Sequence, residues 1–335
     1  MPPLTQDILC VVAAIVILWK CADWFVEGAV AIAEKLAVPQ MLVGLVIVSL
    51  ATTSPELMAS VLAALRGMPE VALGNAVGSV TVDAAVALGL AALVASTPLV
   101  AEPRLFRTSA VMLVCAIILA FVMCLDGVLA RSDGLMLLAL YVGYVVVSYM
   151  RVRRGRAAAD ELPFEPPDER LVQLSAGKTA ACFGLGLAGV LGGSHLLLQG
   201  AVGIAGAAGV PPVVVGLTIV AVGTSMPEIA TCLASALKKQ SGIGVGNILG
   251  ADILNLCWVA GMSAIANPLR AEMRVILVMF PAVAVIVGMM LIMLRWDYRL
   301  SRWNGAVLLA LYIVYIAVLL AFSPREAPIP GIGPS

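Results

Sequence analysis

Residues 44–56 read GLVIVSLATTSPE, and residues 216–228 read GLTIVAVGTSMPE. The second segment follows the first by 172 positions, and the same offset relates GNAVGSVTVD at 74–83 to GNILGADILN at 246–255. Chance can match valine with valine in an apolar chain, but it would not align the rarer Pro-Glu and Gly-Asn dipeptides in one register. The sequence therefore contains an internal duplication, and the two copies align without a gap.

The composition indicates that lipid, rather than water, is the main solvent of this chain. Of 335 residues, 62% are hydrophobic and only 12% are charged, against about 25% charged residues in an ordinary soluble domain. A hydrocarbon core of ~30 Å requires roughly 20 apolar residues per helix. The net charge is zero, which gives no indication of a nucleic-acid partner. The apolar runs that approach this length lie near residues 8–28, 40–65, 70–95, 106–125, 133–150, 179–205, 211–237, 241–264, 273–294 and 304–322.

We therefore predict an all-α integral membrane protein with ten transmembrane helices arranged as two five-helix repeats. The predicted parts are a first repeat at 1–150, a connector at 151–178, a second repeat at 179–325 and a tail at 326–335. Because five is an odd number, the second repeat must enter the membrane from the opposite side. Such inverted repeats are typical of secondary transporters.

The distribution of basic residues predicts the orientation. Fourteen of the twenty Lys and Arg residues lie in loops on the same side as the 151–178 connector, and five lie on the other side. Cytoplasmic loops carry an excess of Lys and Arg, so we expect a cytoplasmic connector, with both termini outside the cell membrane. The segment Met1–Asp7 contains no basic residue, which favours a retained first helix over a cleaved signal peptide.

Two glutamates are predicted to lie deep in the bilayer. Glu56 and Glu228 each precede a basic residue, Arg66 and Lys238, by ten positions. That separation is ~15 Å along a helix, about half the hydrocarbon thickness. A charged residue at this depth costs ~2.5–3.5 kcal/mol on insertion scales, so it normally has a partner or a function. Matching positions in the two copies indicate one shared site, and carboxylates predict that the site binds metal cations.

Neutral oxygen atoms surround both glutamates in the sequence. Proline before each glutamate removes a backbone donor, which frees carbonyl groups to face a cation. The neighbouring hydroxyl groups belong to Thr52, Thr53, Thr224 and Ser225. Calcium and sodium prefer such all-oxygen ligand sets. An alternative is that Ser54-Pro55-Glu56 is simply a helix start with a serine cap, although Met226 cannot cap the second copy.

The second pair of motifs adds polar residues and glycines. Ser79 and Asp83 are four residues apart and share one helical face, as do Ala251 and Asn255. Glycines at the same spacing allow close helix packing. These predicted packing positions are Gly74, Gly78, Gly246 and Gly250.

At these motifs the chain resembles the sodium/calcium exchanger branch of the cation/calcium exchanger superfamily, whose two alpha repeats carry Gly-Thr-Ser-x-Pro-Glu and Gly-Asn-x-x-Gly-Ser-Asn. The resemblance covers about 40–95 and 212–265. It implies that Glu56 and Glu228 bind calcium and that Asp83 and Asn255 occupy the other central positions. The hydroxyl and carbonyl groups that it implies for sodium binding belong to Ser49, Thr52, Thr53, Ser79, Ala221, Thr224 and Ser225.

Several positions depart from the family pattern. Asp83 stands where the family usually has asparagine, and Ala251 replaces a serine that the resemblance would make a sodium ligand. Asp252 adds an acid one position later. These departures keep cation transport as the implied function and leave both sodium and protons open as the coupling ion.

The function predicted from these features is Ca²⁺/Na⁺ antiport by alternating access, because shared ligands cannot favourably hold both kinds of ion together. A proton-coupled exchanger of calcium or another divalent cation is the alternative, and a passive cation channel is a different class. We expect no enzymatic activity and no cofactor. The only histidine, His195, excludes a His-rich metal site, and HExxH and Gly-x-Gly-Asp protease motifs are absent.

Overall fold

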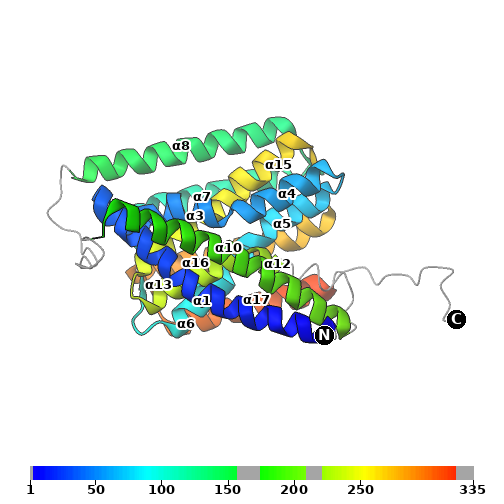
Figure 1. Cartoon of the computed structure of the whole chain (residues 1–335). Helices are drawn as coiled ribbons and strands as arrows, with labels where there is room; N and C mark the ends of the chain where they lie inside the picture. The colour runs from blue at the N-terminus through cyan, green and yellow to red at the C-terminus, as the bar shows by residue number, and fades with distance from the viewer. Residues whose placement is uncertain (1–2, 157–173, 209–220, 322–335) are drawn as a thin grey trace.

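The computed structural model describes residues 3–156, 174–208 and 221–321, and almost all of this part of the chain is helical (Figure 1). The helices, with short π-helical turns labelled η, are α1 (Pro3–Leu36), α2 (Gln40–Val43), η1 (Gly44–Val48), α3 (Ser49–Thr52), α4 (Ser54–Leu65), α5 (Pro69–Thr81), η2 (Val82–Ala87), α6 (Leu88–Val94), α7 (Pro103–Met123), α8 (Arg131–Arg156), α10 (Ala176–Ala207), α12 (Ala221–Thr224), α13 (Met226–Leu237), α14 (Ser241–Leu254), η4 (Asn255–Val259), α15 (Ala260–Ala266), η5 (Val275–Met279), α16 (Phe280–Asp297) and α17 (Arg302–Ala321). Two antiparallel strand pairs tie loops together, β1 (Leu99–Val100) with β4 (Arg299–Leu300) and β2 (Val128–Leu129) with β3 (Leu269–Arg270).

Eight of the described helices are long and apolar enough to cross a bilayer. A ninth span results if Gln40–Thr52 and Ser54–Leu65, which meet at a 42° bend, are counted together. The next apolar helix, Met226–Leu237, is shorter, and part of the span predicted at 211–237 lies outside the described residues, as do most of the connector and the tail. The prediction of an all-α, multi-pass membrane protein is confirmed, whereas ten spans in inverted repeats remain a prediction.

Several helices extend beyond the apolar runs from which they were predicted. The first was expected near 8–28 but spans Pro3–Leu36, and α8 continues past 150 to Arg156. Backbone hydrogen bonding continues into polar flanks such as Glu34 and Lys35, because a helix does not have to end where the hydrocarbon ends.

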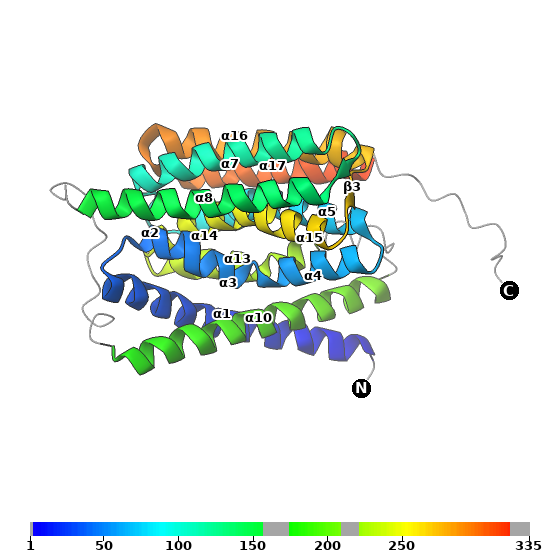
Figure 2. The same cartoon turned by 90° about the horizontal axis from the view of Figure 1, so that it is seen from above.

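The helices form successive layers (Figure 2). Helices α1 and α10 pack along each other as an outer pair. Beside them lie the α2–α4 segment and α13, then α5, α14 and α15, with α7, α8, α16 and α17 on the far side. The middle layers therefore hold the described residues of the duplicated Pro-Glu and Gly-Asn motifs.

Glycines allow α1 and α10 to approach closely. A methyl group added to Gly28 would lie 2.5 Å from the backbone nitrogen of Phe183, and one added to Gly186 would collide with the backbone of Phe25. The rings of Phe25 and Phe183 then contact each other, with centroids 4.8 Å apart. The surfaces of helices α1 and α10 are consequently complementary in shape where they pack together.

The two most buried spans are the ones that carry the Gly-Asn motifs. In the most apolar stretch of Pro69–Val94 78% of the residues are buried, and in that of Ser241–Ala266 83%, against 22% in the first helix. Each is interrupted by a π-helical turn, η2 in the first and η4 in the second. Such turns are frequent at functional sites, and nothing in the sequence pattern predicted them.

Candidate cation site

Both copies of the Pro-Glu motif begin a new helix after the same kind of break. Thr53, with φ −78° and ψ 1°, separates α3 from α4, and Ser225, with φ −82° and ψ 9°, separates α12 from α13. Neither α4 nor α13 has a side-chain cap hydrogen bond. The Ser54 hydroxyl instead donates to the carbonyl of Leu50 at 3.0 Å. The helix-cap alternative therefore does not describe these breaks, although proline does lie in each first turn.

The acidic residues of the motifs are completely enclosed. Glu56 and Asp83 are 0% exposed and Glu228 is 1% exposed. Thr53 Oγ1 donates to Glu228 Oε1 at 3.1 Å, but neither carboxylate oxygen of Glu56 has a hydrogen-bond partner among the described residues. Glu56 lies close enough to Glu228 and Asp83 for the three to repel one another electrostatically.

No basic side chain compensates these acids in the described part of the chain. Its buried polar residues include hydroxyls, amides and carboxylates, but no Lys, Arg or His. A buried carboxylate without a counter-charge is strongly unfavourable. Ionisation of these acids would therefore require a bound cation to neutralise them.

Asp83 and Asn255, which are equivalent in the two copies, meet directly. Asn255 Nδ2 donates to Asp83 Oδ2 at 3.1 Å, and both side chains are fully buried. They lie in the π-helical turns η2 and η4. Asp83 Oδ1 and Asn255 Oδ1 have no partner in the described residues and are left to accept from, or coordinate, another group. The hydroxyl of Ser79 is likewise buried without a partner there.

Two asparagines that were not predicted as site residues link the two copies. Thr52 Oγ1 donates to Asn247 Oδ1 at 3.1 Å, and the equivalent Thr224 Oγ1 donates to Asn75 Oδ1 at 3.4 Å. Asn75 Nδ2 also donates to Ser60 Oγ at 2.9 Å. The Thr–Asn bonds thus join the threonine of each copy to the asparagine of the other. The repeated Gly-Asn dipeptide was the sequence feature that could have identified them.

The remaining predicted ligands differ in how far they are already engaged. The Ser49 hydroxyl donates to the Leu45 carbonyl at 2.7 Å, and its own carbonyl accepts from the Thr53 backbone at 2.9 Å. The Ser225 hydroxyl is buried and lies near the carboxylates of Glu56 and Asp83, although it makes no well-formed hydrogen bond among the described residues. Ala221 is the first residue of α12 and adjoins the undescribed segment 209–220.

The predicted packing glycines behave differently in the two copies. Methyl groups on Gly246 and Gly250 would collide with the carbonyls of Met41 and Leu45, so α14 lies directly against the α2–η1 segment. No described atom lies within 4 Å of such a methyl on Gly74, and on Gly78 the nearest is Met279 Cε at 3.4 Å. The segment related to α2–η1 by the offset of 172 falls largely in the undescribed 209–220.

The carboxylates do not form a metal-binding cluster by themselves. Within residues 3–156, 174–208 and 221–321, no three His, Cys, Asp or Glu side chains are arranged to hold a metal ion together. The other buried polar residues of the motifs carry hydroxyl or amide groups. Any cation bound here would need neutral oxygens as well as acids in its coordination shell.

Comparison with known proteins identifies the family. The protein-family model described as "Sodium/calcium exchanger protein" matches residues 7–150 and 178–321. These residues make up most of the chain and include both copies of the repeat. This chain belongs to the sodium/calcium exchanger family. The resemblance predicted from the motifs is therefore confirmed, and the chain is a membrane antiporter rather than an enzyme.

Individual relatives of this exchanger support the same conclusion over its full length. CaxA of Alkalimonas amylolytica, whose name describes an antiporter, is 32% identical and covers 95% of this chain and 99% of its own length. The sodium/calcium exchanger MaX1 of Methanosarcina acetivorans is 25% identical over 94% of this chain and 99% of its own. A solved structure of the sodium-calcium exchanger NCX_Mj superposes with a TM-score of 0.79 at 28% identity, covering 94% of this chain and 99% of that one.

Proposed function

We propose that this exchanger moves Ca²⁺ and Na⁺ in opposite directions by alternating access at one site between its two repeats. The observation that carries the proposal is the pair of fully buried, mutually repelling glutamates, Glu56 and Glu228, without a basic partner in the described residues. Burial at that cost is expected where a cation regularly binds. Ions are cargo here, and no cofactor is required.

The side chains of the site suit a divalent and a monovalent ion in turn. Calcium takes six to eight oxygen ligands at about 2.3–2.6 Å, and the carboxylates of Glu56 and Glu228 would supply the charge. Sodium, with a single charge, would bind mainly to the neutral hydroxyl, amide and carbonyl oxygens. The groups proposed to complete the two coordination shells are Thr52, Thr53, Ser79, Asp83, Thr224, Ser225 and Asn255, with carbonyls at Ser49 and Ala221. Because these ligands are shared, binding of one ion disfavours the other, and this competition couples the two fluxes.

The proposed architecture is ten helices in two inverted repeats, with both termini outside and the connector cytoplasmic. Lys35 Nζ, at the end of α1, donates to the carbonyl of Leu174, just before the start of α10, at 2.5 Å. These equivalent helices thus run in opposite directions (Figure 2), which supports the inversion. The reciprocal Thr–Asn bonds between the copies support it as well. Inverted copies can exchange conformations, which is the structural basis of alternating access.

The direct test is calcium-45 uptake into proteoliposomes that contain the purified chain. We expect an outward sodium gradient to drive uptake, and a pH gradient without sodium to drive little. Exchange of three sodium ions for one calcium would move one net charge, worth ~2.3 kcal/mol per 100 mV, so uptake should respond to voltage. Equal uptake under a pH gradient alone would favour the proton-coupled alternative, and unitary currents in planar bilayers would favour a channel.

An ion pair that joins the two repeats has no counterpart at the positions related to it by the offset of 172, and it should bias alternating access. Lys238, at the end of α13, lies 2.9 Å from Glu27 and 3.6 Å from Asp23 on α1. The positions equivalent to these two acids carry Gln199 and His195, which bond to each other at 2.9 Å. Exchanging the conformations of the two repeats would therefore break the pair without replacing it.

We expect Lys238→Met to change the equilibrium constant between the two conformations by roughly 1.4- to 5-fold, since a partly exposed ion pair contributes ~0.2–1 kcal/mol. Apparent affinity scales with the fraction of the competent state. The half-saturating calcium concentration should therefore change in opposite directions on the two sides of oriented vesicles. Lys239→Met is the matched control, because Lys239 is exposed. Equal shifts on both sides would contradict the prediction.

A further inference from the structure

Asp252 is a buried acid that the proposed ligand set does not use. It lies in α14 and is 0% exposed, and neither of its carboxylate oxygens has a hydrogen-bond partner in the described residues. It interacts electrostatically with Asp83 and with Glu228. Asp252 therefore lies within electrostatic range of acids that already repel one another.

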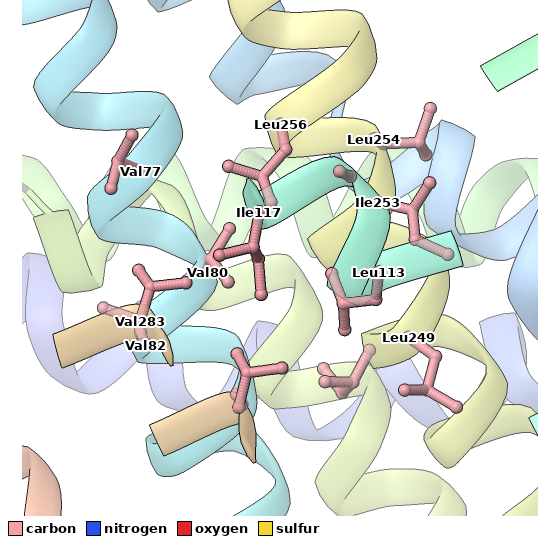
Figure 3. Packing of buried hydrophobic residues seen from close by; sticks show 14 of the residues in the cluster. Val77, Val80, Val82, Leu113, Ile117, Leu249, Ile253, Leu254, Leu256 and Val283 are labelled. Carbon is pink, nitrogen blue, oxygen red and sulfur yellow. The ribbon is translucent and has the colours of Figure 1, made fainter. Parts of the chain in front are cut away.

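The equivalent position in the first copy shows that the fold does not require an acid here. Val80 precedes Asp252 by 172 residues, is also 0% exposed, and packs in the apolar core among Val77, Leu113 and Ile117 (Figure 3). An apolar side chain thus satisfies this helical position completely in one repeat. The carboxylate in the other repeat needs a different explanation.

A compensating change lies directly beside Asp252. The first copy has a hydroxyl at Ser79, whereas the second copy has Ala251 at the equivalent position. The second copy has therefore lost one neutral oxygen and gained two anionic ones a residue later. An ionised carboxylate enclosed in the membrane, without a basic partner, needs a bound cation to balance it.

We propose that Asp252 is a fourth anionic member of the transport site and that it binds a monovalent cation, in place of the hydroxyl missing at Ala251. This inference rests on the proposed exchange function and deepens it. With Asp252, the sodium-loaded site holds one more monovalent cation than Glu56, Asp83 and Glu228 would balance alone. One more sodium ion is then exchanged for each calcium ion, and one more net charge moves per cycle.

Thermal unfolding of the purified full-length chain tests cation binding without transport. The probe is sodium chloride, titrated against choline chloride at constant ionic strength, because a ligand stabilises the state that binds it. We expect Asp252→Asn to melt above the wild type in choline alone, since the uncompensated charge is gone. Its half-saturating sodium concentration should rise at least ten-fold. Asp297→Asn, at an exposed acid near the end of α16, should behave like the wild type.

Two results of the melting experiment would overturn the proposal. If Asp252→Asn and the wild type respond identically to sodium, Asp252 is an uncharged packing residue. If both Asp252→Asn and Asp252→Val fail to fold in choline, the acid serves the fold rather than a cation. The double variant Ala251→Ser/Asp252→Asn, which restores a Gly-Ser-Asn sequence, should recover part of the lost sodium response.

The transport arm measures the charge moved per calcium ion, from the reversal potential of exchange in proteoliposomes. We expect Asp252→Asn to lower this number by one, while calcium is still exchanged. An unchanged number would overturn the inference and leave the proposed function intact. If the wild type does not exchange calcium for sodium, the proposed function fails, and the sodium-dependent melting then decides alone whether Asp252 binds a cation.

Discussion

Glu56→Gln should reduce sodium-driven calcium uptake to background, and Glu228→Gln should do the same. Both side chains are enclosed, and neutral glutamine would not supply the negative charge that a cation bound between them needs. Removing one member of a buried charge pair typically costs ~3–5 kcal/mol. The lower end of that range already corresponds to a loss of more than roughly 100-fold. Calcium-45 uptake at saturating sodium gradients measures the loss directly.

The same variants should remain folded, which separates ligand loss from structural damage. Glutamine keeps the size of the side chain, and at Glu56 it replaces by a neutral amide a carboxylate whose oxygens both have no hydrogen-bond partner in the described residues. Thermal stability in cation-free buffer should therefore not fall. Glu272→Gln makes the same change in an exposed loop and should transport like the wild type. Wild-type uptake in either glutamate variant would refute the site.

Gly250→Ala should disrupt the centre of the protein although it adds one methyl group. That methyl would lie 2.5 Å from Ser49 Oγ and collide with the carbonyl of Leu45. A backbone carbonyl inside a helix cannot rotate away, so α14 would have to move from the α2–η1 segment. We expect a loss of about 3 kcal/mol, at the upper end for overpacked cores, together with loss of transport.

The matched control for this variant is Gly143→Ala on α8, where no described atom lies within 4 Å of the added methyl. Alanine favours a helix over glycine by about 0.5–1 kcal/mol, so this control should be neutral or slightly more stable. Thermal unfolding in detergent compares the two. A melting temperature for Gly250→Ala equal to that of Gly143→Ala would mean that the close helix contact is not required.

Much of the candidate site followed from the duplicated motifs, because burial of acids in an apolar chain is informative in itself. Asn75 and Asn247 were missed as site residues, since an amide in a Gly-Asn pair is equally compatible with helix packing. Their pairing with Thr224 and Thr52 depends on contacts between segments 149 and 195 residues apart. Such contacts are set by how the helices pack, which no local pattern specifies.

The sequence by itself determined that this is a multi-pass membrane protein with two related halves and acids at matching positions of the repeat. Hydrophobic length, charge placement and register are local properties, and the bilayer converts them into topology. Only the tertiary structure decided that Asn255 meets Asp83, that π-helical turns hold both residues, and that Asp252 is enclosed without a partner in the described residues. These features arise where helices from different halves pack together. Their geometry depends on side-chain shape across the interface rather than on spacing along one helix.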